Sequence, residues 1–309
     1  MNFTLKQLRY VEAAGRLGSI AKAAVEVSIS QSSITASIDA LEASLDYALF
    51  VRTPAKGITP TSAGREALQL ISTYLNQTRQ FDSELQSQGG DNTGLVRIAC
   101  YATAAPTFLP PILKSITKNF PGISVKVMEG NMMSIVDYLD NGEVDLVFTY
   151  DRHVPPVQAF EPLFPAPPYA LISKSDAASQ LPSITFEKLS KKPMVMLDLP
   201  YTRDYFLGLF RTRGLEPELA HFTRSSEIAQ ALVEGDFGYT LLNIRPRTYS
   251  DKDSRFSAVP ISDTSSVPVF GIATLSNLRQ PKNVRSFIKI CTQLRDAGVF
   301  DRCTVSETS

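Results

Sequence analysis

Hydrophobic and polar positions at the start of the chain predict three short helices within residues 1–60. An apolar stripe begins at Leu5 and Leu8, and Ser19 stands where the N-cap of a second helix is expected. A third helix is predicted to begin after Ser30, and only a short turn separates it from the second. Small alanine side chains in the second helix allow the two helices to cross closely. This order of elements is typical of a helix-turn-helix.

The third predicted helix has one apolar face. At about 100° per residue, its apolar residues fall within about 60° of one another, so this face is expected to pack in a core. Ser32, Ala36 and Asp39 point away from that face. The predicted core residues are Ile34, Ile38, Leu41 and Leu45.

Residues 51–64 have the Pro, Gly and Thr content of a loop or small wing, which carries Arg52 and Lys56. A long helix is predicted to follow. Thr59 is expected to cap this helix, with Pro60 at its first position, where a missing N–H costs no hydrogen bond.

This linker helix is predicted at residues 61–88, and its apolar stripe is wide. So wide a stripe needs a partner, and a second copy of the same helix is the expected one. Packing of the stripe against the rest of the same chain stays open, because the stripe is short and contains polar members. It consists of Leu68, Ile71, Leu75, Thr78, Asp82 and Leu85, flanked by Leu70, Tyr74 and Phe81.

A polar, glycine-rich hinge is predicted at residues 89–94, and the pattern changes beyond it. Buried strands alternate with helices in two successive sets, which predicts two α/β lobes with a cleft between them. The stretch VPVFGIAT is expected to return to the first sheet. We therefore place a bilobal α/β domain at residues 95–303, with lobe one at 95–165 and 266–303 and lobe two at 166–265.

Composition narrows the classes of function. Lys plus Arg and Asp plus Glu both total 31, so net charge does not draw the chain to nucleic acid or membranes, and any DNA binding must come from local placement. The sequence shows no signal-peptide core and no apolar run that spans a membrane, which predicts a cytoplasmic protein without a membrane partner. Cys100, Cys291 and Cys303 are scattered and do not form a disulfide framework.

Signs of an enzyme are weak. His153 and His221 are the only histidines, and neither has the spacing of a metal ligand to a second His or to Cys. Phosphate-binding and nucleophile-elbow motifs are absent from the sequence, so no metal, cofactor or catalytic residue is predicted. From these residues alone, two alternatives stay open, a bilobal enzyme and a small-molecule-binding protein of the transport type, both acting without DNA.

Three segments within the first 65 residues resemble, in order and spacing, the DNA-binding domain of LysR-type transcriptional regulators: LKQLRY, GSIAKAAVEVSISQSSITASIDALEASLDYALFVR and ITPTSAG. The segments FPGISVKVMEG, LDNGEVDLVF and SSEIAQALVEGDFGYTLL are similar, more loosely, to the family's effector-binding domain. The resemblance implies a winged helix-turn-helix at 1–60, a linker helix and a bilobal domain like that of periplasmic binding proteins. It also implies a bacterial regulator that binds double-stranded DNA and a small-molecule effector.

The third helix is then the recognition helix. The first residues of such a helix meet base edges in the major groove, where Gln pairs with adenine and Ser or Thr with several bases. Many relatives have Arg where this chain has Ala36 and Asp39, so the grip on phosphates must come from the edges of the motif, and dimerisation becomes more necessary. The predicted base-reading residues are Gln31, Ser32, Ser33 and Thr35, and the predicted phosphate contacts are Arg9, Lys22, Arg52 and Lys56, with Lys6.

The effector site is predicted at the carboxyl ends of the strands, where doubly wound lobes bind ligands. Hydroxyl side chains at helix starts suit a carboxylate, because the first helix N–H groups lie beside them. The same residues could serve only as helix caps, and that alternative stays open. The predicted effector contacts, taken from the strand ends and the resemblance, are Thr103, Asn131, Tyr150, Thr202, Arg203 and Ser226.

The resemblance further implies how such a protein acts. Linker helices pair two heads on an interrupted inverted repeat, and contacts between effector domains join two dimers into a tetramer that bends DNA. A small, anionic effector that closes the cleft would alter the bend and the access of RNA polymerase, which is therefore a candidate partner.

Overall fold

The computed structural model describes residues 3–53, 57–87, 92–155, 158–246, 255–264, 266–276 and 280–306 of the chain. The chain forms two compact units, one of residues 1–88 with 140–142 and one of residues 89–139 with 143–309. Lys56 and residues 89–91 of the predicted hinge lie outside the described residues. Across the described ranges, no helix is long and apolar enough to cross a lipid bilayer.

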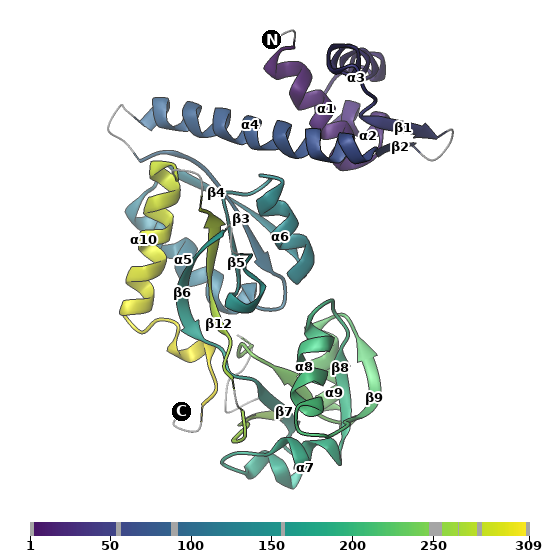
Figure 1. The fold of residues 1–309 in the computed structure, drawn as a ribbon. Helices are drawn as coiled ribbons and strands as arrows, with labels where there is room; N and C mark the ends of the chain where they lie inside the picture. The colour runs from purple at the N-terminus through teal and green to yellow at the C-terminus, as the bar shows by residue number, and fades with distance from the viewer. Residues whose placement is uncertain are drawn as a thin grey trace. The chain divides into compact units, whose positions relative to one another are not determined.

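The first unit opens with the three predicted helices, α1 (Leu5–Leu17), α2 (Ile20–Glu26) and α3 (Gln31–Leu45) (Figure 1). Both predicted caps are confirmed. The hydroxyl of Ser19 accepts the N–H of Lys22, and the hydroxyl of Ser30 accepts the N–H of Ser33. Local sequence thus determines where α2 and α3 begin. These two helices form the helix-turn-helix.

The core of this unit forms on the predicted face of α3. Ile34, Ile38 and Leu41 are buried, and Leu45 is half-buried at the end of the helix. These side chains belong to one apolar cluster with residues of α1 and α2, among them Val11. Each fully buried aliphatic side chain stabilises the fold by about 1.5–3 kcal/mol. The packing therefore holds the opposite face of α3 outward.

A two-stranded wing follows, with β1 (Phe50–Thr53) antiparallel to β2 (Gly57–Pro60). The start of the next helix differs from the prediction, because β2 extends through Pro60 and the N–H of Gly64 donates to the Thr61 hydroxyl at 2.8 Å. The expected cap at Thr59 is therefore wrong, since Thr59 pairs within the wing. A side chain at Gly64 is excluded by close packing, since its Cβ would lie 1.9 Å from the carbonyl oxygen of Leu49.

Helix α4 (Ser62–Ser87) divides its apolar residues between two faces. The residues of the predicted stripe that pack against the core of the first unit are Leu68, Ile71 and Leu75. The large apolar side chains that are exposed, and that fall within about 60° of one another around the helix, are Leu70, Tyr74, Phe81 and Leu85. The alternative of packing against the same chain is therefore confirmed for Leu68, Ile71 and Leu75. The unit itself covers part of that stripe, and the outward face, here called the α4 stripe, consists mainly of the flanking residues.

Lobe one of the second unit is built on one sheet. Its strands are β3 (Gly94–Tyr101), β4 (Ile123–Gly130), β5 (Leu146–Tyr150), β6 (Gln158–Pro165) and β12 (Val269–Leu275). They lie in the order β4-β3-β5-β12-β6, with β3, β4 and β5 parallel and β12 antiparallel to both neighbours. The predicted return of β12 to the first sheet is confirmed, whereas β6 was not predicted.

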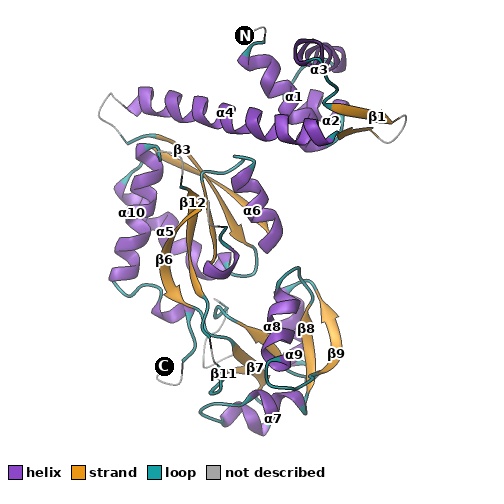
Figure 2. Ribbon diagram, in the orientation of Figure 1, coloured by secondary structure: helices purple, strands orange, loops and turns teal. Residues whose placement is uncertain are grey.

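Helices cover both faces of this sheet (Figure 2). Helices α5 (Ala105–Asn119) and α10 (Lys282–Asp296) contact each other on one face, and α6 (Met132–Asp140) lies on the other. Aromatic rings fill the core, with the Phe108 ring 4.7 Å from that of Phe148 and 4.9 Å from that of Phe270 between centroids. Two 3₁₀ turns complete the lobe, η1 (Asp151–His153) and η3 (Asp301–Cys303).

Lobe two has two smaller sheets. Strand β7 (Tyr169–Ser173) is antiparallel to β10 (Thr240–Leu242) and to β11 (Phe256–Pro260), while β8 (Pro193–Leu197) is parallel to β9 (Glu218–Thr223). An isolated bridge between Met194 and Tyr239 links the two sheets. Four predicted strands are confirmed, and β11 was missed. The helices are η2 (Ala177–Gln180), α7 (Phe186–Ser190), α8 (Thr202–Arg211) and α9 (Ser226–Glu234).

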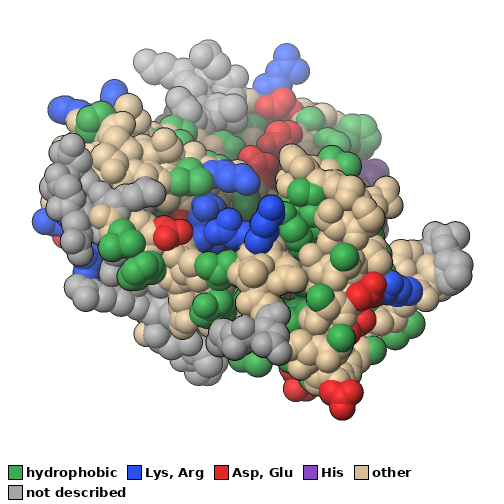
Figure 3. All heavy atoms as spheres, turned by 90° about the horizontal axis from the view of Figure 1, so that it is seen from above, with side chains coloured by type: hydrophobic (Ala, Val, Ile, Leu, Met, Phe, Trp, Pro, Cys, Tyr) green, Lys and Arg blue, Asp and Glu red, His purple; other side chains and the backbone are tan. Residues whose placement is uncertain are grey.

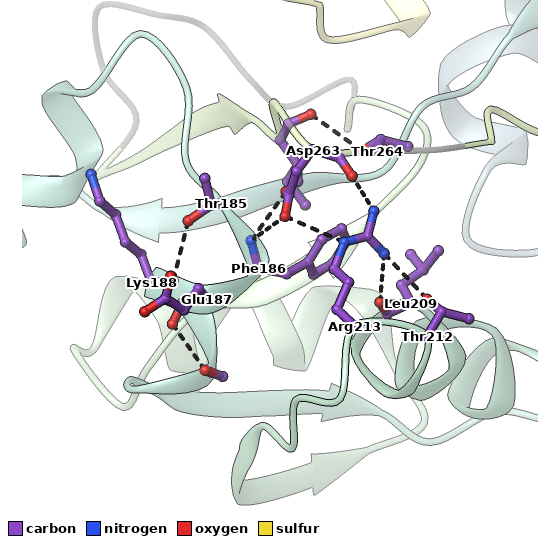
Figure 4. Close-up of polar contacts among 11 residues, drawn as sticks. Thr185, Phe186, Glu187, Lys188, Leu209, Thr212, Arg213, Asp263 and Thr264 are labelled. Atoms are coloured by element: carbon purple, nitrogen blue, oxygen red, sulfur yellow. Dashed lines mark hydrogen bonds and ion pairs between the residues drawn. The ribbon is translucent and has the colours of Figure 1, made fainter.

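An arginine clamp ties elements of lobe two together (Figure 4). The guanidinium of Arg213 donates to the carbonyl of Leu209 at 2.7 Å and lies 3.3 Å from the carboxylate of Asp263. That carboxylate also accepts the N–H of Phe186 at 3.2 Å, and the guanidinium lies 4.5 Å from the centroid of the Phe186 ring. These groups satisfy one another, so the clamp stabilises the lobe and is not a candidate ligand site.

Candidate functional sites

The outer face of α3 begins with short polar residues. Gln31, Ser32 and Ser33 are exposed, and Thr35 is half-buried beside them. The Ser30 hydroxyl lies 2.8 Å from the hydroxyl of Ser32 and 2.9 Å from that of Ser33, which fixes both side chains at the helix start. The four predicted base-reading residues therefore share the first turns of α3. Gln31 has the longest reach among them.

The predicted phosphate contacts differ in their surroundings. Arg9 and Lys22 are exposed. Arg52 of β1 is engaged by its own chain, because its guanidinium hydrogen-bonds to the carboxylate of Asp39 on α3 and lies 3.9 Å from that of Glu42. On the face drawn in Figure 3, Lys and Arg side chains stand in small groups, with acidic and apolar side chains nearby. The pairing of Arg52 with Asp39 leaves the guanidinium partly neutralised before DNA binds.

The pair of Arg52 and Asp39 links the wing to the recognition helix. The two side chains are 43% and 56% exposed, and such exposed pairs contribute only about 0.2–1 kcal/mol. A DNA phosphate can therefore compete with Asp39 for the guanidinium. The sequence did not predict this pair, because 13 positions separate its members and no helical period relates them.

A pocket opens between the two lobes of the second unit, at the carboxyl ends of β3, β5 and β8. Its volume is about 50 Å³. Among the described residues that line it, none is Asp or Glu, and the cation is Arg152. The lining residues are Tyr101, Thr103, Ala104, Met132, Tyr150, Arg152, Leu197, Tyr201, Thr202, Tyr205, Phe206, Ser226, Gln230, Leu242, Asn243, Ile244, Pro246 and Pro268.

Four of the six predicted effector residues line this pocket. They are Thr103, Tyr150, Thr202 and Ser226. They come from four different strand ends or helix starts, as expected where parallel strands end at one edge of a sheet. The structure thus brings them together, and their contact with a ligand stays a prediction.

The other two predicted residues do not line the pocket. Asn131 caps α6, with its side-chain oxygen accepting the N–H groups of Met133 at 3.0 Å and Ser134 at 3.1 Å. Arg203 forms an ion pair with Asp198 at 3.2 Å. Asn131 therefore serves as a helix cap, which is the alternative left open for the predicted effector residues. Arg203 is held by Asp198 of the same lobe.

Arg152 is the charged residue of the described lining, and the sequence did not single it out. It lies in η1, directly after β5, and its guanidinium lies 5.7 Å from the centroid of the Tyr205 ring of lobe two. It also donates to the hydroxyl of Ser266. The available sequence signal was a basic residue two positions past a buried strand. That signal is weak, because basic residues are common in surface turns.

Tyrosine hydroxyls supply neutral donors around the pocket. Burial raises the pKa of Tyr101, of Tyr150 and of Tyr205, so all three phenols stay protonated at neutral pH. The hydroxyls of Tyr101 and Thr202 hydrogen-bond to each other, which joins the end of β3 to the start of α8. An anion in the pocket would therefore meet Arg152 and O–H groups.

Two helices begin at the pocket without a side-chain cap. Ala104 precedes α5 and Tyr201 precedes α8, and neither side chain accepts a hydrogen bond from the first turn. Tyr201 also has a φ of 62°, in the left-handed region that costs a residue with a Cβ about 1–2 kcal/mol. Helix starts of this kind carry partial positive charge, which favours an anion over a cation beside them.

Thiol and metal chemistry find little support here. Cys100, Cys291 and Cys303 are free and buried, and burial raises the pKa of Cys100 to about 12 and that of Cys303 to about 11. The reactive thiolate form is thereby disfavoured. Among the residues that the structure describes, no group of three or more His, Cys, Asp and Glu could hold a metal ion.

A winged helix-turn-helix in one unit and a bilobal α/β unit with a pocket between its lobes define the class of ligand-responsive DNA-binding regulators. Residues 5–65 match the bacterial regulatory helix-turn-helix protein, lysR family, and residues 89–295 match the LysR substrate binding domain. The chain therefore belongs to the LysR family of transcriptional regulators. It is a DNA-binding transcriptional regulator with an effector-binding domain, and the resemblance carried by its motifs is confirmed.

Relatives and solved structures agree with this assignment. The chain is 26% identical to the HTH-type transcriptional regulator CysB of Haemophilus influenzae, over 81% of this chain and 78% of that protein. The crystal structure of HinK, a LysR family transcriptional regulator from Pseudomonas aeruginosa, has a TM-score of 0.62 at 27% identity and covers 96% of this chain and 98% of its own. Full-length CbnR complexed with its target DNA shares the fold, with a TM-score of 0.55 at 20% identity over 95% and 100% of the two chains.

Proposed function

We propose that the pocket between the lobes binds a small organic anion and that this ligand controls the regulator. The observation that supports this most strongly is the presence of Arg152 among protonated hydroxyls, with no acidic side chain among the described lining residues. Hydrogen bonds to charged groups contribute about 1.5–3 kcal/mol each, so a carboxylate would gain more here than a neutral ligand. The chain would then act by binding alone, without catalysis.

Calorimetric titration of the full chain tests the charge of the ligand. Short carboxylates such as propionate and butyrate are expected to bind and to raise Tm through mass action, whereas the matched amines and alcohols are not. Preference for the amine of each pair, or an absence of binding for every carboxylate, would contradict an anion site.

We also propose that the α4 stripe forms a dimer with a second copy of the chain. Leu70 is 73% exposed and Phe81 is 61% exposed, which is unusual for large apolar side chains on one helix face. Pairing two such helices would bury both stripes. Two heads joined in this way would meet the halves of an interrupted inverted repeat, and contacts between effector domains would join two dimers into a tetramer.

Ligand and DNA are coupled, in this proposal, through the two lobes. Lobe one and lobe two contact each other at the pocket through Tyr101 with Thr202 and through Arg152 with Tyr205. A ligand that enters between these residues would favour one pose of the lobes over another, and only a difference in affinity for the two poses can shift their populations. The shift would alter DNA bending and the access of RNA polymerase.

Within the DNA-binding unit, we expect Asp39→Asn to raise affinity for every DNA sequence about threefold to tenfold, because it frees Arg52 for a phosphate. The slope of log affinity against log salt concentration should steepen by about one.

Arg52→Ala should lower affinity on all sequences, whereas Gln31→Ala should mainly reduce the preference for the operator over random DNA. Fluorescence anisotropy with both DNAs over a range of salt concentrations measures each quantity.

Asp46→Asn serves as the control for charge alone, because it removes one negative charge at the end of α3 and Asn tolerates the left-handed backbone there. An equal gain in affinity for the Asp46 and Asp39 variants would show that net charge, and not the release of Arg52, is responsible. An equal loss on operator and random DNA for Gln31→Ala would contradict its base-reading role.

A further inference from the structure

A second cavity adjoins the pocket between the lobes. It shares Met132, Arg152 and Tyr201 with that pocket and is lined further by Met133, Val136, Asp137, Val154 and Pro155. We call it the methionine groove. Its volume is about 380 Å³, on the same measure that gives about 50 Å³ for the pocket. The two cavities are therefore neighbours with common walls, and the groove is the larger.

The methionine groove offers more free space than the pocket. Arg152 lines both cavities, so a ligand anchored at Arg152 can extend from the pocket into the groove.

The groove differs from the pocket in chemistry. Apart from Arg152 and Asp137, the described residues that line it are apolar or aromatic, and Met133 is 49% exposed. Methionine side chains are flexible and polarisable, so they adapt to hydrocarbon and aromatic shapes. Arg152 is the cation among the described residues of the groove, so the groove offers an anion no second cation. The anionic end therefore belongs at Arg152 and the apolar end in the groove.

Tyr201 stands where the two cavities meet. Its side chain is half exposed, and its backbone φ of 62° positions it directly before α8. Conformations of this kind persist where the surrounding structure demands them and are enriched at functional sites. The ring contributes an apolar wall to both cavities, so one ligand can contact it along its length.

We propose that the effector is an amphipathic monocarboxylate, with its carboxylate at Arg152 and an apolar body of about four to seven carbon atoms in the methionine groove. This inference rests on the proposed function of the pocket as an anion site. It adds the chemical class of the ligand and assigns Met133 as a residue that sets ligand length.

Titration of the full chain with unbranched carboxylates from acetate to octanoate tests the proposal. Burial of each methylene strengthens binding by about 0.8 kcal/mol, so Kd should fall about threefold to fourfold per carbon from butyrate onward. Met133→Gln should weaken octanoate about fivefold or more and leave acetate and propionate within twofold of the unmodified chain. Val127→Gln, which changes a 37% exposed apolar residue of the same lobe outside both cavities, should change neither.

The outcomes distinguish the anion site at Arg152 from the amphipathic ligand in the methionine groove. If short carboxylates bind and Kd does not fall with chain length, the amphipathic ligand is excluded while the anion site stands. If no carboxylate of any length binds, both the anion site and this inference fail. An equal loss for propionate and octanoate in Met133→Gln would exclude the groove as the site of the apolar end.

Discussion

Replacing Phe81 with glutamate is expected to lower affinity for a two-half-site operator about a hundredfold or more. Phe81 lies in the middle of the α4 stripe and is 61% exposed, so the change costs the folded chain little but places two carboxylates in the proposed dimer. Two linked DNA-binding heads bind DNA with an affinity about 10²–10⁴ times that of a single head, and this gain is lost when the dimer separates. Analytical ultracentrifugation and operator titration on the same samples measure the two effects together.

Gln69→Glu provides the matched control, because it adds the same charge at an exposed position on a different face of α4. It should leave both the dimer and the operator affinity within about twofold of the unmodified chain. A dimer that survives Phe81→Glu, or an equal loss in both variants, would exclude the α4 stripe as the interface.

Replacing Arg152 with alanine should weaken carboxylate binding about tenfold to a hundredfold, because the charged hydrogen bonds at this position contribute about 1.5–3 kcal/mol. Arg152→Lys should recover only part of the loss, since an ammonium lacks the planar, two-pronged geometry of a guanidinium. Isothermal titration calorimetry with butyrate and octanoate measures the change. Operator affinity without ligand should stay within twofold.

The control here is Arg203→Ala, which removes an arginine of the same unit that pairs with Asp198 outside the pocket. Carboxylate affinity should not change in that variant. Equal losses in both variants would mean that overall charge, and not contact at the pocket, governs ligand binding. Since Arg152 donates to Ser266, the Tm of its variants shows whether the lobe itself is intact.

The first unit could be predicted well because its signals are local. The hydroxyls of Ser19 and Ser30 each accept the backbone N–H of the residue three positions later. Ile34 and Ile38 are four positions apart, which places both on the buried face of one helix. Such features depend on neighbours in sequence. The parallel strands of the effector-binding domain were predicted for the same reason, since each is a short apolar run between turns.

What could not be predicted depends on contacts between distant residues. Arg52 meets Asp39 only because the wing folds against the recognition helix, and Arg152 reaches Tyr205 only because the two lobes face each other. The division of α4 into covered and exposed faces likewise depends on where the core of the first unit ends. Periodicity identifies an apolar face, but it does not show which part of the chain covers that face.

We propose that a carboxylate in the pocket changes the regulator's complex with DNA. The most direct test is energy transfer between dyes at the two ends of an operator fragment from upstream of its own gene, with the tightest-binding carboxylate of the series added to the full chain. We predict that transfer changes with a midpoint at the calorimetric Kd, and that Arg152→Ala moves the midpoint about tenfold to a hundredfold higher. Transfer that stays constant at saturating ligand, or a midpoint that Arg152→Ala leaves unmoved, would contradict the claim.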